Sequence, residues 1–356
     1  MKRAAAHHAT AALRLLAALA LLAPLAGCNR KPQLVPRSAD STATAPADSF
    51  SLVVRDVQQR WEAGDDNEQA ASASARLLLA DFTARPAAAL DARARTLLDS
   101  LGVGGEIAGG GGAVAVNLFS RADPEGDSWP WLFWREGGKA RAQAIEGRGL
   151  HLAELAARDP GTDSAQVAAI FARRAGGGQQ PLLMVWGRQG SRWELRQTLG
   201  ADSLGGTGSA AFEGGDDRPD LVARTHRNTP RFEECATCPH IYHTLRFTWG
   251  TEGFARVSDE MASSPYAAFV QLIQALLEND RDAAERLVTE RRLVDQARKA
   301  EWNKSKGVWR AAPATDEAAQ SIVFFRGTEE AWRVSFEQRG GEWRMSGFEA
   351  TSRTIE

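Results

Sequence analysis

Two cysteines and two histidines within nine residues offer the most chemistry in this 356-residue sequence. The segment Cys235-Ala236-Thr237-Cys238-Pro239-His240 sets two thiols three positions apart, and His243 follows closely. Such a group of side chains has three chemical uses: a structural disulfide, a redox-active dithiol, or a zinc site that also takes the two histidines. A disulfide across so short a loop contributes about 2 kcal/mol in the chain-entropy model, which is enough to hold a turn.

The residues around this motif favour the disulfide. Residues 241–249 are largely β-branched and aromatic, so the motif should lead into a strand and not into the helix N-terminus that activates a thiol. The four ligands of a zinc site would be crowded into nine residues, and on a strand His240 and His243 would point to opposite faces. We therefore predict a disulfide between Cys235 and Cys238, with no bound metal and no cofactor. A thiol–disulfide active protein is the alternative.

The third cysteine, Cys28, ends the segment Leu25-Ala26-Gly27-Cys28, which follows a basic start and an apolar run from Leu15 to Leu22. The run is too short for a membrane-spanning helix and has the flanks of a secretory signal. The segment resembles the bacterial lipobox, in which the cysteine thiol is acylated and becomes the new amino terminus after cleavage. The resemblance implies a signal peptide over residues 1–27 and fatty acids such as palmitate on Cys28. In the Gram-negative sorting pattern that this segment resembles, an Asp after the cysteine favours retention at the inner membrane, so the resemblance, with Asn29 at that position, implies the outer membrane, facing the periplasm.

Composition and missing motifs narrow the functional class. The chain has 43 basic and 45 acidic residues, and loss of Lys2, Arg3 and Arg14 with the signal peptide leaves a formal charge of about −5. A mildly acidic protein repels a phosphate backbone, so we expect no nucleic acid partner. The sequence also lacks the HExxH zinc helix, the GxSxG nucleophile elbow and the phosphate-binding loop. We therefore predict that the protein is not an enzyme.

The helices and strands expected along the sequence, which must position the cysteines and histidines, indicate an α+β fold. Residues 28–48, rich in Pro, Ser, Thr and Ala, have the composition of a disordered tether. Apolar residues at helical spacing predict short helices over residues 49–102. Residues 103–262 predict a β-rich domain, an antiparallel sheet or sandwich, in which three tryptophans each precede a glycine turn and a returning strand. These are Trp134, Trp186 and Trp249. A propeller-like repeat is the less favoured alternative, because the spacing of the three hairpins is irregular.

A strong helix start opens the last domain, residues 263–356. Ser263-Ser264-Pro265 precedes two helical stretches, and strands around turns at Gly327 and Gly340-Gly341 close the sequence. This order resembles the cone-shaped fold of nuclear transport factor-like proteins and ketosteroid isomerase. The resemblance implies two helices against a curved antiparallel sheet, with a small apolar ligand between them in many members. It carries no catalytic Asp or His onto this sequence, since no histidine follows His243.

An aromatic pair supplies the candidate binding surface. Trp129 and Trp131 flank Pro130, and this arrangement could leave both rings exposed to a glycan or an envelope protein. Two acidic loops, residues 123–127 and 213–220, favour solvated turns over calcium sites. Together these observations predict a lipid-anchored periplasmic protein that binds a ligand or partner without catalysis. An envelope assembly scaffold is the alternative function.

Overall fold

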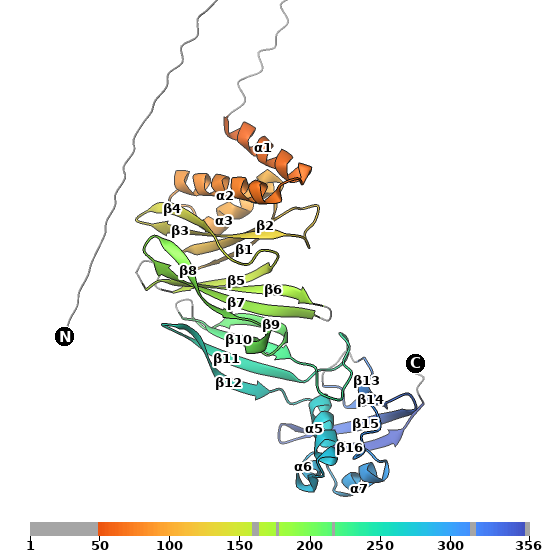
Figure 1. The fold of residues 1–356 in the computed structure, drawn as a ribbon. Coiled ribbons are helices and arrows are strands. Elements are labelled where there is room, and N and C mark those ends of the chain that lie inside the picture. The colour runs from red at the N-terminus through yellow and green to blue at the C-terminus, as the bar shows by residue number, and fades with distance from the viewer. Residues whose placement is uncertain (1–48, 159–163, 176–177, 216–217, 314–317, 353–356) are drawn as a thin grey trace, which may run out of the picture. The chain divides into compact units, whose positions relative to one another are not determined.

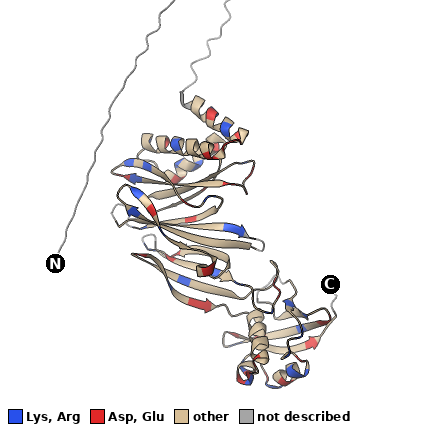
Figure 2. Ribbon diagram, in the orientation of Figure 1, with Lys and Arg blue, Asp and Glu red and all other residues tan. Residues whose placement is uncertain are grey.

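Helices and four-stranded antiparallel sheets follow one another in an α+β arrangement, as the sequence predicts (Figure 1). This computed structural model describes residues 49–158, 164–175, 178–215, 218–313 and 318–352. The predicted signal peptide, Cys28 and the tether of residues 28–48 lie outside the described residues. Basic and acidic side chains are interspersed along the described helices and strands (Figure 2). Among these residues, no helix is both long enough and apolar enough to cross a membrane.

The segment predicted to be helical forms three helices: α1 (Ser49–Ala63), α2 (Asn67–Ala84) and α3 (Leu90–Leu101). Asp66 caps α2, because its side chain accepts a hydrogen bond from the Gln69 backbone N–H at 3.0 Å. Gly102 ends α3 in the left-handed conformation, with φ 69°, which costs glycine little. The apolar faces of the helices cover one side of the first sheet. Their shared core includes Val57, Trp61, Leu78, Phe82, Leu98, Val114, Val116 and Phe133.

The β-rich part forms three sheets, each an antiparallel meander of strands that are neighbours in the chain. The first sheet comprises β1 (Gly104–Gly110), β2 (Ala113–Phe119), β3 (Ser128–Glu136) and β4 (Lys139–Ala144). The second comprises β5 (His151–Arg158), β6 (Gln166–Ala175), β7 (Gly178–Gln189) and β8 (Arg192–Leu199). After the short helix α4 (Ala201–Leu204), the third comprises β9 (Thr207–Glu213), β10 (Asp220–His226), β11 (Tyr242–Gly250) and β12 (Gly253–Met261).

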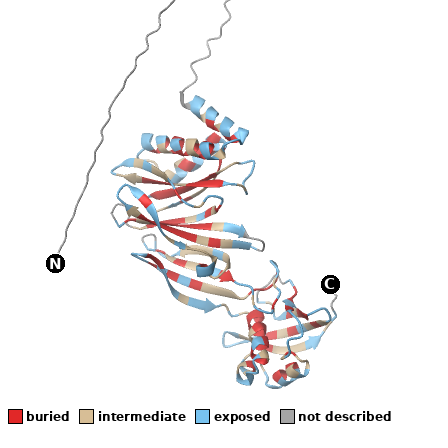
Figure 3. Ribbon diagram, in the orientation of Figure 1, coloured by how far each residue is buried: buried red, intermediate tan, exposed pale blue. Residues whose placement is uncertain are grey.

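The three sheets stack face to face, so the second sheet is buried on both sides (Figures 1 and 3). Successive side chains of a strand point to opposite faces, and here both faces find an apolar partner. The core between the first and second sheets includes Ala115, Leu132, Trp134, Leu155, Phe171 and Trp186. The core between the second and third sheets includes Ile170, Val185, Leu221, Phe247 and Trp249.

The three predicted hairpins turn out to mark one sheet each. Trp134, Trp186 and Trp249 lie in β3, β7 and β11, which are the third strands of the three successive sheets. Their spacing is unequal because α4 and the long connection 227–241 belong to the third unit. The antiparallel sheet or sandwich predicted for this region is thus a stack of three repeated four-stranded units.

The last domain combines three helices with a fourth antiparallel sheet. The helices are α5 (Pro265–Leu277), α6 (Arg281–Arg286) and α7 (Arg292–Lys299), and the strands are β13 (Trp309–Ala311), β14 (Ser321–Arg326), β15 (Glu330–Arg339) and β16 (Glu342–Ala350). Ser264 caps α5 by accepting a hydrogen bond from Ala267 N–H at 3.1 Å. The second predicted helix is interrupted, because the backbone of Leu287 and Thr289 pairs with Met345 of β16 through two hydrogen bonds of 2.9 Å.

Aromatic rings fill the space between α5 and the fourth sheet. Phe269 of α5 stacks on Phe324 of β14 with centroids 3.7 Å apart, and Trp302 is fully buried beside them. The ring centroids of Trp309 and Phe348 lie 5.6 and 4.3 Å from the centroid of the Trp302 ring. These large side chains occupy the position where the resemblance implied a small apolar ligand. The resemblance to nuclear transport factor-like proteins stays a prediction.

Candidate functional site

The connection between β10 and β11, residues 227–241, ties the third sheet to the last domain. Phe232 forms a parallel bridge with Trp309 of β13, through hydrogen bonds from Glu233 N to Trp309 O at 2.7 Å and from Trp309 N to Arg231 O at 3.0 Å. The Phe232 ring is buried edge-on to Tyr266 of α5, with centroids 6.0 Å apart. Long connections that a fold holds in place often carry function.

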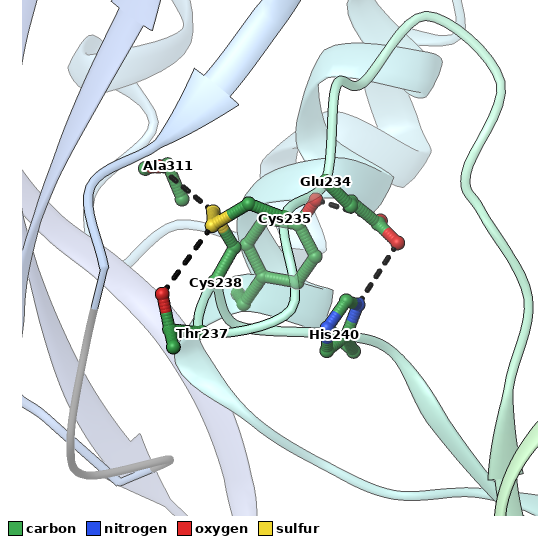
Figure 4. Close-up of a disulfide and its surroundings, with 7 residues drawn as sticks. Glu234, Cys235, Thr237, Cys238, His240 and Ala311 are labelled. Carbon is green, nitrogen blue, oxygen red and sulfur yellow. Dashed lines mark hydrogen bonds and ion pairs between the residues drawn. A yellow bond between two sulfur atoms is a disulfide. The ribbon is translucent and has the colours of Figure 1, made fainter. Parts of the chain in front are cut away.

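The predicted disulfide between Cys235 and Cys238 is present in this connection (Figure 4). It closes a turn in which Cys238 N donates to Cys235 O at 3.0 Å, and the two Cα atoms lie 4.9 Å apart. Cys238 is buried, with its Sγ 3.6 Å from Ala311 O, whereas Cys235 is exposed. The motif thus lies in a turn and not at the first turn of a helix, the setting that lowers the pKa of an attacking thiol.

Next to the disulfide, His226, Glu234 and His240 converge from three places in the chain. His226 ends β10, Glu234 precedes Cys235, and His240 lies two residues before β11. The imidazole rings of His226 and His240 stack with centroids 3.7 Å apart. His240 Nδ1 lies 3.1 Å from Glu234 Oε2 (Figure 4). The other carboxylate oxygen accepts a hydrogen bond from the Tyr266 hydroxyl at 2.9 Å. One nitrogen or oxygen from each of the three residues lies within 4.8 Å of the others.

Burial and hydrogen bonding set the charges in this cluster. Burial alone raises the pKa of Glu234, but hydrogen bonds from His240, Thr229 and Tyr266 outweigh it and hold the pKa below its ordinary value. Burial is the largest cause of the raised pKa of Tyr266, and the negative charge of the adjacent Glu234 carboxylate is the second. Burial also lowers the pKa of His226, and the neighbouring His240 acts in the same direction. The cluster therefore combines a carboxylate with a neutral imidazole at His226.

The zinc ligands considered from sequence do not come together in the structure. Cys235 and Cys238 are bonded to each other, and His243 Nδ1 lies 2.8 Å from Asp259 on the neighbouring strand β12. The partner of His240 is instead His226, which the sequence analysis missed. Finding it requires the register of β10 and β11, in which His226 is opposite Tyr242.

The exposure predicted for the aromatic pair in β3 is wrong for Trp129. Only 9% of Trp129 is exposed, because the Trp61 ring of α1 packs against it with centroids 6.0 Å apart. The guanidinium of Arg148 lies 5.4 Å from the centroid of the same ring. Trp131 is half-buried against the same core. The two rings therefore do not form the exposed pair that was expected to receive a glycan or a partner.

Several carboxylates of the two acidic loops form ion pairs with arginines. Asp127 pairs with Arg148 at 2.7 Å, and Glu125 pairs with Arg174 at 2.8 Å. In the second loop, Glu213 pairs with Arg246 at 3.2 Å, and Asp216 lies outside the described residues. These carboxylates therefore have side-chain partners, and the solvated turns stay a prediction.

Two neighbouring hollows lie along the outer face of α5, and we refer to them together as the α5 cleft. Their volumes are about 450 and 320 Å³, and both are lined by Met261, Gln271 and Gln274. The larger continues along α5 towards α6 and the start of β16, where Trp343 lies. The smaller extends over β11 and β12 to the connection 227–230. Thr229 of that connection also hydrogen-bonds Glu234, so the cleft borders the histidine cluster.

Comparisons of the chain with models of protein families, with curated proteins and with solved structures find no match. The residues of the α5 cleft and of the histidine cluster therefore carry the functional inferences below.

Proposed function

We propose that this protein is a membrane-anchored lipoprotein of the bacterial envelope that binds an extended segment of a partner protein in the α5 cleft, without catalysis. The lipobox-like segment that ends at Cys28 supports the anchor and the envelope location. The Cys235–Cys238 disulfide agrees with a compartment outside the cytoplasm, where such bonds persist. The outer membrane, facing the periplasm, is the proposed site of the anchor.

The lining of the α5 cleft is the observation that carries the binding proposal. Amide and hydroxyl side chains are distributed over an apolar floor along its length. The hydrogen-bonding groups are Asn228, Thr229, Ser263, Ser264, Gln271 and Gln274, and the apolar ones are Ile241, Leu245, Met261, Ala267, Leu287 and Trp343. An extended peptide has a matching composition, because backbone amides alternate with side chains along it. Charged side chains of both signs also line the two hollows, with Glu278, Arg286 and Glu342 in the larger and Arg227, Arg256 and Asp259 in the smaller.

The strand beside the cleft adds a second contact surface of the same kind. β12 is an edge strand of the third sheet, and its residues Val257 and Met261 are 62% and 44% exposed. Edge strands are places where a partner segment can add a strand through backbone hydrogen bonds. Met261 ends β12 and also lines both hollows, so a segment lying along this edge can continue into the cleft.

A photo-crosslinking amino acid introduced at Gln274 tests this proposal in living cells. Gln274 is exposed on α5 and borders both hollows. We expect irradiation to yield one discrete, protease-sensitive adduct, detected by immunoblotting and identified by mass spectrometry. The matched control is the same substitution at Gln338, an exposed residue at the end of β15, which should give at least 10-fold less adduct.

The outcomes of this experiment separate the candidate ligands. A protease-resistant adduct that a glycosidase removes would replace the partner protein by a glycan. Equal adducts at Gln274 and Gln338, or none at either position, would contradict binding in the α5 cleft.

A further inference from the structure

The three converging side chains next to the disulfide form a donor set that metals use. Two imidazoles and one carboxylate suit borderline divalent ions, and Zn²⁺ takes this set with a fourth position left for water. Zinc bonds of about 2.0–2.2 Å place tetrahedral ligands about 3.4 Å apart. The ligand atoms of His226, Glu234 and His240 already lie within 4.8 Å of one another. Because the His226 and His240 rings stack with centroids 3.7 Å apart, one ring must turn out of the stack to direct its nitrogen lone pair at the same ion.

A buried atom without a partner is the second observation, and it is independent of the clustering. His226 is 9% exposed, and its Nδ1 is buried without a hydrogen-bond partner. Buried polar atoms are normally satisfied, so an orphaned ring nitrogen beside two other donors requires an explanation. The side chains of Glu234 and His240, only 1% and 7% exposed, leave bulk water little access to supply that partner. A bound cation would give the His226 nitrogen the partner that it lacks, with Glu234 and His240 beside it as further ligands.

We propose that His226, Glu234 and His240 form a binding site for a divalent transition metal ion, with Zn²⁺ as the best fit. This assignment departs from the metal-free protein predicted from sequence, and it is independent of the function proposed for the α5 cleft. Tyr266 and Thr229 orient the Glu234 carboxylate through hydrogen bonds, the usual arrangement behind a ligating group.

A metal ion bound here would link three segments of the chain. His226 belongs to the end of β10, His240 leads into β11, and Glu234 lies between them next to the Cys235–Cys238 disulfide. The hydrogen bond from Tyr266 extends the group to α5 of the last domain. A cation at this point would help to hold connection 227–241 in place, and residues 227–230 and Ile241 of this connection line the smaller hollow of the α5 cleft.

Zinc binding by the purified mature protein tests the proposal. The protein is treated with a chelator, desalted and titrated with Zn²⁺ under non-reducing conditions, and the bound metal is measured by calorimetry and by elemental mass spectrometry. We expect one Zn²⁺ per chain. His226→Ala and Glu234→Gln should each weaken binding at least about 100-fold, and Tyr266→Phe about 10-fold, because it removes only an orienting hydrogen bond. The control is His243→Ala, which changes a histidine outside the cluster and should bind as the unaltered protein does.

Shape-preserving variants and a cobalt absorption spectrum test the metal site further. Glu234→Gln and Tyr266→Phe nearly preserve side-chain shape, so they decide the matter if His226→Ala does not fold by circular dichroism. Co²⁺ in place of Zn²⁺ should give the visible absorption of a nitrogen- and oxygen-ligated ion, without a thiolate charge-transfer band. The proposal is overturned if the unaltered protein retains no Zn²⁺, if His243→Ala loses as much affinity as Glu234→Gln, or if the thiolate band appears.

Discussion

Replacement of Cys28 by serine is expected to abolish fatty acylation of the protein, because a hydroxyl stands where the lipobox-like segment supplies a thiol. Each buried methylene of an acyl chain contributes about 0.8 kcal/mol to membrane binding, and a single chain anchors only marginally. The two or three chains expected on Cys28 would therefore be enough to anchor the protein permanently. Intact-mass measurement of the unaltered protein should show loss of residues 1–27 together with added acyl mass. The serine variant should show neither change.

A second form of this experiment tests where the protein is located. When an ordinary cleavable secretory signal replaces residues 1–28, nearly all of the protein should move from the membrane fraction to the soluble periplasmic fraction. A chain with both Cys235→Ser and Cys238→Ser but an intact Cys28 serves as the control and should stay with the membrane. An unmodified amino terminus on the unaltered protein would refute the anchor. It would also remove the main reason to place the chain in the envelope.

Local signals predicted the helices, because their causes lie within a few residues. Gly102 ends α3, and Ser264 with Pro265 starts α5, as capping chemistry requires. The break between α6 and α7 was not predictable in this way, since it comes from pairing of Leu287 and Thr289 with the distant Met345. The stacking of three sheets was missed for the same kind of reason. Which face of β7 meets which neighbour depends on contacts between strands far apart in the sequence.

In the candidate site, too, features set by local contacts were predictable from sequence and features set by distant contacts were not. The disulfide was predictable, because Cys235 and Cys238 are three residues apart and need only a turn. The histidine cluster was not, because His226 reaches His240 through the pairing of β10 with β11. Trp129 was expected to be exposed next to a proline, but α1 supplies Trp61 to cover it. Composition and spacing thus identified reactive residues, whereas their neighbours came only from the folded chain.

Arg326 at the end of β14 is expected to be among the most costly side chains to remove. Its side chain is 2% exposed, and its guanidinium lies 5.1 Å from the centroid of the Trp309 ring. Nε donates to Glu330 at 2.8 Å, and the two Nη groups donate to Glu301 O at 2.8 Å and to Ala300 O at 3.1 Å. One planar cation therefore serves a carboxylate and two backbone carbonyls that follow α7, which a lysine cannot reproduce.

Arg326→Ala should lower the free energy of unfolding by about 3–5 kcal/mol, since it leaves Glu330 and both carbonyls without their buried partner. Arg326→Lys keeps the charge but loses the fork of donors, so it should recover only part of this loss. Urea unfolding followed by far-ultraviolet circular dichroism measures both variants. Arg333→Ala is the control, because Arg333 is 55% exposed and its pair with Glu349 is 3.7 Å long, so its removal should cost at most about 1 kcal/mol. Equal losses of unfolding free energy in Arg326→Ala and Arg333→Ala would contradict the prediction, because burial of the Arg326 guanidinium would then add nothing to stability.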